Sequence, residues 1–207
     1  MIVLLLRHGQ TEWNVARRMQ GRADLPLSAA GRAQVGAWHL PAALAGARVV
    51  SSPLVRAVET GRLLTGQEPD IEPDLIEMDW GRWEGETFAS LRAALGPVYA
   101  AQEARGLDYR PPDGESPRDV QRRVFAWFER MAAEPGPVVA VTHKGVLRAV
   151  LAQLTGWPML GKAPVKLADD CAHLMEVGTT GAVRAVGWNV PLRVARVGPE
   201  APQRPPG

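Results

Sequence analysis

The sequence predicts one α/β domain built around a largely parallel sheet, and two apolar runs separated by helical segments carry that prediction. Residues 2–6 read IVLLL and residues 138–142 read VVAVT. Runs without a charged side chain are typical of strands that are covered on both faces, as in parallel sheets. A chain of 207 residues suffices for one such domain with a small insertion, and we expect no second full domain.

The segments that follow the first run alternate between helix and strand signals. Ser28 suits an N-cap, so we expect a helix over residues 29–40. Residues 48–50 resemble a short strand. After it, Ser52 suits a second N-cap and Pro53 the first helical position, and helical spacing continues through Val55 and Val58 to Leu63. This assignment places Arg56 in the first turn of the second helix.

The middle of the chain predicts an irregular segment beside the sheet. Residues 75–85 begin extended and turn at Gly81 and Gly85, and a helix is expected from Phe88. A Pro/Gly loop, YRPPDGESP, ends at residue 117. We therefore expect a lid insertion over residues 80–117 within a single domain that spans residues 1–190.

The rest of the chain predicts two helices, two closing strands and a tail. RDVQRRVFAWFERMAA at residues 118–133 has an amphipathic pattern, and VLRAVLAQL follows the second apolar run. CAHLMEV at 171–177 and AVRAVGWNV at 182–190 alternate as strands do. GPEAPQRPPG at residues 198–207 predicts a disordered tail.

Composition favours a cytoplasmic protein without membrane or nucleic-acid partners. The formal charge is only +2, and no basic run of the kind found in nucleic-acid-binding segments occurs. Cys171 is the single cysteine, so neither an internal disulfide nor a Cys-rich metal site can form. The first apolar run is far shorter than the roughly 20 residues of a membrane span.

The two apolar runs end alike. Arg7-His8-Gly9 follows the first run and His143-Lys144-Gly145 follows the second. Ligands of open α/β sheets bind beyond the carboxyl ends of the strands, so the two histidines are expected in one pocket. A single histidine at a strand end would most simply be a satisfied, partly exposed side chain. The two matching strand ends, together with Arg7 and Arg56, favour a ligand-binding site instead.

These residue types suit phosphoryl transfer. A neutral imidazole such as that of His8 is a good nucleophile towards phosphorus, and the phosphohistidine so formed can pass its phosphoryl group to water. Arg7 and Arg56 can hold the phosphoryl oxygens with paired hydrogen bonds, and His143 can donate another. With fixed cations in these places, the reaction needs no metal or cofactor.

Six motifs in order resemble those of the histidine phosphatase superfamily, which includes cofactor-dependent phosphoglycerate mutases. They are LLLRHGQTEWN, QGRADLPLSAAGRAQ, SSPLVRAVETGRLL, LIEMDWGRWEG, DGESPRDVQRRV and VVAVTHKGVLRAVL, and the resemblance runs from Met1 to about Asn189. It implies a three-layer α/β/α sandwich with a mostly parallel central sheet, as in phosphoglycerate mutases. The alternation of strands and helices agrees with that fold.

The resemblance also implies roles for particular residues. His8 matches the phosphorylated nucleophile and His143 the second pocket histidine. Arg7 and Arg56 match the phosphate-clamping arginines. Glu77 matches the proton donor to the leaving oxygen, whereas its local sequence alone would indicate a solvated carboxylate. The residues expected to bind phosphate or substrate are Thr11, Asn14, Gln20, Gly21, Lys144 and Gly145.

Some assignments stay open at the level of sequence. Thr11 suits a turn as well as a pocket hydroxyl. Lys144 stands where the family often has a small residue, so it either meets an acidic substrate or points to solvent. Trp13, Trp80 and Trp83 either wall the pocket or belong to the core. We expect structural roles for the remaining histidines, His39 within a helix and His173 within a strand.

The expected function is a metal-independent phosphomonoesterase that hydrolyses a small-molecule phosphate ester through a phosphohistidine. The resemblance favours the phosphatase branch, which includes α-ribazole phosphatase, because the segment between Glu77 and His143 is short and the tail has little charge. A cofactor-dependent phosphoglycerate mutase is the first alternative. A non-catalytic phosphate-binding module is the second, although every catalytic position is filled here. Whether the chain forms a homodimer is left open.

Overall fold

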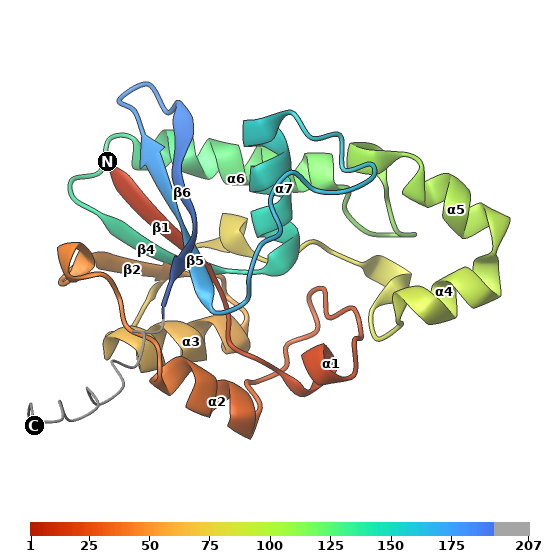
Figure 1. Cartoon of the computed structure of the whole chain (residues 1–207), viewed down its shortest axis with the longest axis horizontal. Coiled ribbons are helices and arrows are strands. Elements are labelled where there is room, and N and C mark those ends of the chain that lie inside the picture. Colours follow the sequence, from red (N-terminus) through yellow and green to blue (C-terminus); the bar gives the residue numbers. More distant parts are fainter. Residues whose placement is uncertain (193–207) are drawn as a thin grey trace, which may run out of the picture.

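The computed structural model describes residues 1–192 and contains a six-stranded mixed sheet (Figure 1). The predicted disordered tail, residues 198–207, lies outside the described residues. The strand order is β3-β2-β4-β1-β5-β6. The pairs β3–β2, β2–β4 and β4–β1 are parallel, whereas β5 pairs antiparallel with β1 and β6 antiparallel with β5. The strands are β1 (Ile2–Arg7), β2 (Arg48–Ser51), β3 (Asp70–Ile71), β4 (Val138–Thr142), β5 (Cys171–Val177) and β6 (Val183–Pro191).

Helices cover both faces of this sheet, which confirms the predicted α/β fold. The α-helices are α1 (Glu12–Val15), α2 (Ala29–Gly36), α3 (Val55–Thr65), α4 (Phe88–Leu95), α5 (Pro97–Glu103), α6 (Pro117–Met131) and α7 (Lys144–Thr155). Short 3-10 helices are η1 (Ala42–Leu44), η2 (Pro73–Leu75), η3 (Gly81–Trp83) and η4 (Gly106–Asp108). α6 and α7 lie on one side of the sheet and α2 and α3 on the other (Figure 1).

The central strands divide the core into two layers because successive side chains of a strand point to opposite faces. Val3 and Leu5 of β1 belong to the hydrophobic cluster that includes residues of α6 and α7. Leu4 and Leu6 belong to a second cluster, with Val35 of α2. β4 lies between β1 and β2, and all five of its residues are buried. The two continuous apolar runs are therefore the most enclosed strands, as the sequence predicted.

Three strand ends meet at one edge of the sheet. β1 and β4 pair in register up to Arg7 and Thr142, and the His8 backbone N–H then donates to the Thr142 carbonyl at 3.0 Å. The Ser52 backbone N–H, just after β2, donates to the Val141 carbonyl at 3.0 Å. This parallel register places the residues after all three strands side by side, although they are far apart in the sequence.

Helix α2 is shorter than predicted, since it ends at Gly36 and not at residue 40. Trp38 turns into the core, where its indole N–H donates to Asp170 Oδ1 at 3.2 Å. The backbone N–H of His39 donates to the Leu192 carbonyl at 2.6 Å. These long-range contacts replace the helical bonds of the last turn. His39 is consequently an exposed residue after the helix, and its predicted place within a helix was wrong.

Helix α3 begins at Val55, with Leu54 at the N-cap, so the prediction that Ser52 caps it was wrong. Ser52 Oγ accepts a hydrogen bond from the Leu54 backbone N–H at 3.3 Å within the turn before the helix. The hydroxyl also contacts His143, as described below. Arg56 lies in the first turn of α3, as predicted.

Residues 80–117 form η3, α4, α5 and η4, and α4 and α5 extend from one side of the molecule (Figure 1). Trp83, Leu91, Tyr99 and Tyr109 from this segment are buried in the same hydrophobic cluster as Val124 of α6. The inner side of the segment is thus part of the core. That residues 80–117 form a lid insertion within the domain stays a prediction. None of the helices within residues 1–192 is long and apolar enough to cross a membrane.

Candidate active site

A cavity of about 770 Å³ opens at the carboxyl ends of β1 and β4. Of the predicted site residues, it is lined by Arg7, His8, Asn14, Gln20, Arg56, Glu77, Lys144 and Gly145. His143 lies directly behind His8, with the two ring centroids 5.1 Å apart. The structure therefore gathers the predicted catalytic residues from β1, α3, β4 and the segment after η2.

His8 is held in a form suited to nucleophilic attack. Its side chain is buried, and Nδ1 lies 2.6 Å from the Gly9 carbonyl oxygen. A carbonyl oxygen only accepts hydrogen bonds, so we assign the hydrogen to Nδ1 and the lone pair to Nε2. Burial, and then the charges of Arg7 and Arg56, hold the pKa of His8 well below 6.5. The imidazole is therefore neutral at neutral pH.

His143 presents one ring nitrogen without a partner. Its Nε2 lies 2.6 Å from Ser52 Oγ, and its buried Nδ1 has no hydrogen-bond partner in the described part of the chain. Ser52 Oγ accepts from the Leu54 N–H and can donate its own hydrogen to Nε2, and on that arrangement we assign the ring hydrogen to Nδ1. Burial, and then the charge of Arg56, hold the pKa of His143 well below 6.5. Nδ1–H is then a neutral donor that awaits an acceptor.

Arg56 is completely buried, and the loop after Gln20 fixes its position. Nη1 donates to the Ala23 carbonyl at 2.7 Å and Nη2 to the Gly21 carbonyl at 2.8 Å. Gly21 has a positive φ of 49°, in the left-handed region that favours glycine. Gly21 therefore acts through its backbone oxygen and is not among the residues that line the cavity.

Three buried nitrogen atoms around His8 lack a hydrogen-bond partner within residues 1–192: Arg7 Nε, Arg56 Nε and His143 Nδ1. Arg7 also forms an ion pair with Asp169 through Nη1. Each unpaired buried donor costs about 1–3 kcal/mol, so a folded protein contains few of them. Three of them, two on cationic side chains, indicate a site for the oxygens of an anion.

Glu77 faces the cavity with both carboxylate oxygens held by the backbone. Oε1 accepts from the Met78 N–H at 2.8 Å and Oε2 from the Gly145 N–H at 3.2 Å. A β-carbon at Gly145 would lie only 2.4 Å from Glu77 Oε1. Gly145 therefore permits the close approach of the start of α7 to this carboxylate, and any side chain there would displace it.

Thr11 supports the cavity wall from behind and does not line the cavity. It caps α1, and its hydroxyl donates to Gln20 Oε1 at 2.9 Å. Asn14 lines the cavity, and its Oδ1 accepts a hydrogen bond from the Thr11 backbone N–H at 3.0 Å. The amide NH₂ of Asn14 has no partner among the described residues. The capping box thus orients the Asn14 amide group.

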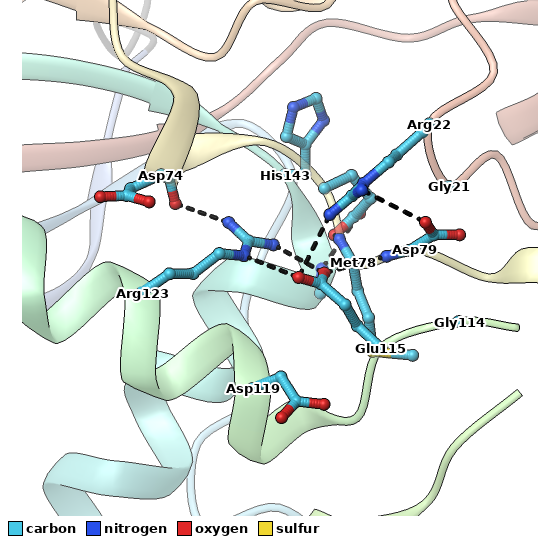
Figure 2. Close-up of polar contacts among 12 residues, drawn as sticks. Gly21, Arg22, Asp74, Met78, Asp79, Gly114, Glu115, Asp119, Arg123 and His143 are labelled. Atoms are coloured by element: carbon cyan, nitrogen blue, oxygen red, sulfur yellow. Dashed lines mark hydrogen bonds and ion pairs between the residues drawn. The ribbon is translucent and has the colours of Figure 1, made fainter.

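A polar network around Glu115 joins the loop after Gln20 to the segment that carries Glu77 (Figure 2). Glu115 forms ion pairs with Arg22 at 3.1 Å and with Arg123 of α6 at 3.2 Å. It also accepts the Asp79 backbone N–H at 3.2 Å, and Arg22 pairs with the Asp79 carboxylate at 3.2 Å. Arg123 in turn donates to the Asp74 carbonyl at 2.5 Å. The network therefore fixes the backbone on both sides of Glu77.

The structure decides the open tryptophan assignments and adds cavity residues that the sequence did not indicate. Trp13 and Trp80 line the cavity, whereas Trp83 is buried in the core. Arg148 and Asp169 also line it, and neither lies in a segment whose local pattern distinguishes it from a solvated charge. Arg148 lay within the predicted helix, which began only at Val146. The structure starts α7 at Lys144, four residues before Arg148, and so places both on one face of the helix.

His173 is structural, as expected. It is fully buried in β5, where Nδ1 accepts the Asn189 backbone N–H at 3.2 Å. Burial lowers its pKa to about 4. Within residues 1–192, no group of three or more His, Cys, Asp or Glu side chains is arranged to hold a metal ion.

Comparison with known proteins gives a consistent match. Residues 3–191 match the family model described as histidine phosphatase superfamily (branch 1). A glucosyl-3-phosphoglycerate phosphatase from Mycolicibacterium vanbaalenii is 34% identical, over 91% of this chain and 92% of that protein. A 2,3-bisphosphoglycerate-dependent phosphoglycerate mutase from Gloeobacter violaceus is 33% identical, over 74% of this chain and 75% of the relative.

Solved structures agree with the sequence match. A mycobacterial glucosyl-3-phosphoglycerate phosphatase in complex with VO3 has a TM-score of 0.75 and 31% identity, and the match covers 91% of this chain and 98% of that one. An Escherichia coli structure, whose description proposes an alpha-ribazole-5'-P phosphatase, also has a TM-score of 0.75, with 25% identity over 94% of this chain and 98% of the other.

Proposed function

The chain is a phosphatase that belongs to the histidine phosphatase superfamily, branch 1, and we propose that it hydrolyses a small-molecule phosphate monoester through a phosphohistidine at His8. The reaction needs no metal ion. The observation that carries this proposal is the set of unpaired buried nitrogens on Arg7, Arg56 and His143 around a neutral imidazole. They form a cradle for a phosphoryl group beside the free Nε2 lone pair.

In the first step, His8 Nε2 attacks phosphorus and the bond to the ester oxygen breaks. Arg7, Arg56 and His143 donate to the phosphoryl oxygens while the leaving oxygen gains charge. Glu77, in its protonated form, gives its hydrogen to that oxygen, so an alcohol leaves. Its carboxyl group is held at the cavity wall by the Met78 and Gly145 N–H groups.

In the second step, water attacks the phosphohistidine and restores the enzyme. Glu77, now a carboxylate, takes a proton from the water as its oxygen bonds to phosphorus, and the bond from phosphorus to Nε2 breaks. Inorganic phosphate leaves, His8 is neutral again and Glu77 is protonated again. The Gly9 carbonyl keeps the ring orientation through Nδ1–H during both steps.

The cavity suits an organic phosphate ester larger than phosphate itself. Its volume of about 770 Å³ lies within the range of small-molecule pockets. Trp13, Trp80 and Phe88 line it beyond the phosphate cradle, and their ring faces can pack against the body of a substrate. Relatives named glucosyl-3-phosphoglycerate phosphatase support a sugar or glycerate phosphate as the substrate class.

The experiment is to measure phosphate release from p-nitrophenyl phosphate and glycerol 3-phosphate in the presence of EDTA. We expect turnover to continue, and His8→Ala to abolish it. His39→Ala, a change at an exposed histidine away from the cavity, should retain it. If EDTA stops turnover and Mg²⁺ restores it, the mechanism is wrong. Conversion of 3-phosphoglycerate to 2-phosphoglycerate without phosphate release would identify a mutase instead.

A further inference from the structure

Two cationic side chains on α7 face the cavity next to the phosphate cradle. Lys144 is the first residue of α7, directly after His143, and Arg148 follows one helical turn later. Side chains four residues apart lie on one face of a helix, about 6 Å apart along its axis. Both residues line the cavity. The positive charge of the cavity therefore extends from Arg7 along α7.

Neither side chain has a hydrogen-bond or ion-pair partner within residues 1–192. The other arginines of the cavity differ in this respect: Arg7 pairs with Asp169 and Arg92 with Glu103, and Arg18 donates to the Gly85 carbonyl. Arg17 and Lys144 are exposed to water, where an unpaired cation is ordinary, so the lack of an acceptor within residues 1–192 carries weight only for Arg148. A partly buried arginine such as Arg148 ordinarily finds an acceptor for its five N–H groups.

Arg148 is held in place although its donors are unused. Its guanidinium lies over the Trp157 ring, 4.9 Å from the ring centroid. A cation–π contact of this kind holds the guanidinium without a hydrogen-bond acceptor, so its N–H groups remain available to an anion. Burial lowers the pKa of Arg148, and burial and then the charge of Arg7 lower the pKa of Lys144. An anionic ligand would relieve both effects.

We propose that Lys144 and Arg148 form a second anion subsite, which binds a carboxylate or second phosphate group of the substrate one helical turn away from the phosphoryl group that is transferred. This inference rests on the proposed function, because it assigns the remainder of the substrate to the same cavity. The single phosphoryl group is already served by Arg7, Arg56 and His143. The charges on α7 thus select esters that carry a further negative charge.

The test compares matched substrates in the full-length enzyme. 3-Phosphoglycerate differs from glycerol 3-phosphate by a carboxylate in place of a hydroxymethyl group, and propane-1,3-diol bisphosphate differs from 3-hydroxypropyl phosphate by a second phosphate. We expect at least one doubly anionic member to have the higher kcat/KM. Lys144→Gln and Arg148→Gln should each lower kcat/KM for that member by about tenfold or more, through KM. Both should change the singly anionic member by less than about twofold.

A matched control and a binding measurement separate the possible failures. Lys162→Gln removes an exposed lysine that does not line the cavity. It should leave kcat/KM unchanged for the doubly and the singly anionic esters. Dissociation constants of the same esters, measured in His8→Ala, which does not turn over, should show the same preference for the doubly anionic ester. If Lys144→Gln and Arg148→Gln change kcat/KM equally for the doubly and the singly anionic ester, or do not change it, the proposed subsite is wrong and the proposed function still stands. Loss of phosphate release from every ester would instead contradict the proposed function, and the binding data would then decide on the subsite.

Discussion

The imidazole rings of His8 and His143 lie 5.1 Å apart, centroid to centroid, at the ends of two neighbouring parallel strands. Each is neutral, and each has one nitrogen fixed by the protein, Nδ1 of His8 by the Gly9 carbonyl and Nε2 of His143 by Ser52. The other nitrogen of each ring is left for the substrate. One ring can then act as nucleophile and the other as hydrogen-bond donor to the same phosphoryl group.

Gly145→Ala should damage catalysis while the fold is retained. The new methyl group would lie 2.4 Å from Glu77 Oε1, so the carboxylate must move away from the leaving oxygen. We expect kcat to fall by about ten- to a hundredfold, less than the roughly 10²–10⁴-fold that a general acid contributes, because the carboxylate is displaced and not removed. Gly36→Ala is the control, because a β-carbon there meets nothing within 4 Å. Unchanged kcat in Gly145→Ala would remove Glu77 from the mechanism.

Asp169→Asn should strengthen the binding of phosphate analogues. The Asp169 carboxylate pairs with Arg7 and therefore competes with a phosphoryl oxygen for that guanidinium. Because Asp169 is 62% exposed, its pairing contributes little, and we expect the inhibition constant of orthovanadate to fall by about two- to fivefold. Asp70→Asn breaks a similarly exposed pair with Arg48 outside the cavity and should have no effect. Weaker inhibition in Asp169→Asn would show that Asp169 positions Arg7 instead.

Glu115→Gln should lower both stability and turnover. The substitution keeps the volume but removes the charge that Arg22 and Arg123 share (Figure 2). We expect a loss of about 1–3 kcal/mol in the free energy of unfolding, measured with urea, and a decrease in kcat of the folded enzyme. The decrease follows because the network fixes the backbone around Glu77. Glu129→Gln, on the exposed side of α6, is the control. Normal kcat would confine Glu115 to a structural role.

Stability should fall as the pH decreases from 7 to 5, partly because of His173. The folded state keeps this side chain neutral down to a pKa of about 4, whereas the unfolded chain binds a proton near pH 6.5. The unfolded state therefore gains protons first, and acid favours unfolding. We expect the decrease in unfolding free energy between pH 7 and pH 5 to be smaller in His173→Gln by roughly 1–2 kcal/mol. His39→Gln should behave like the wild type, and an identical decrease in all three proteins would contradict the assignment.

The sequence predicted the parts of the fold and site that depend on local pattern. The apolar runs around Leu4 and Val139 identified the central strands, and the matching ends of these runs placed His8 next to His143. The fold class and the α-helix starting points at Ala29 and Phe88 followed from hydrophobic periodicity and capping residues, and α6 starts at Pro117, one residue before its predicted start. These features are set by neighbours in the chain.

The features that the sequence could not supply depend on contacts between distant segments. Trp38 ends α2 early because Asp170 accepts its indole N–H. Ser52 has the residue type of a helix cap, yet its hydroxyl is used by His143 from another strand. Glu115 and Arg148 have functional places only because α6 and α7 pack where they do. No local periodicity distinguishes such residues from ordinary surface charges.

The most direct test of the account is to trap the covalent intermediate. The enzyme is mixed with a ³²P-labelled phosphate ester, quenched in alkali within a single turnover and digested, and the labelled peptide is identified. We predict acid-labile, alkali-stable label on His8, and none in His8→Asn. Release of phosphate without label on His8, or label on another residue, would contradict the account.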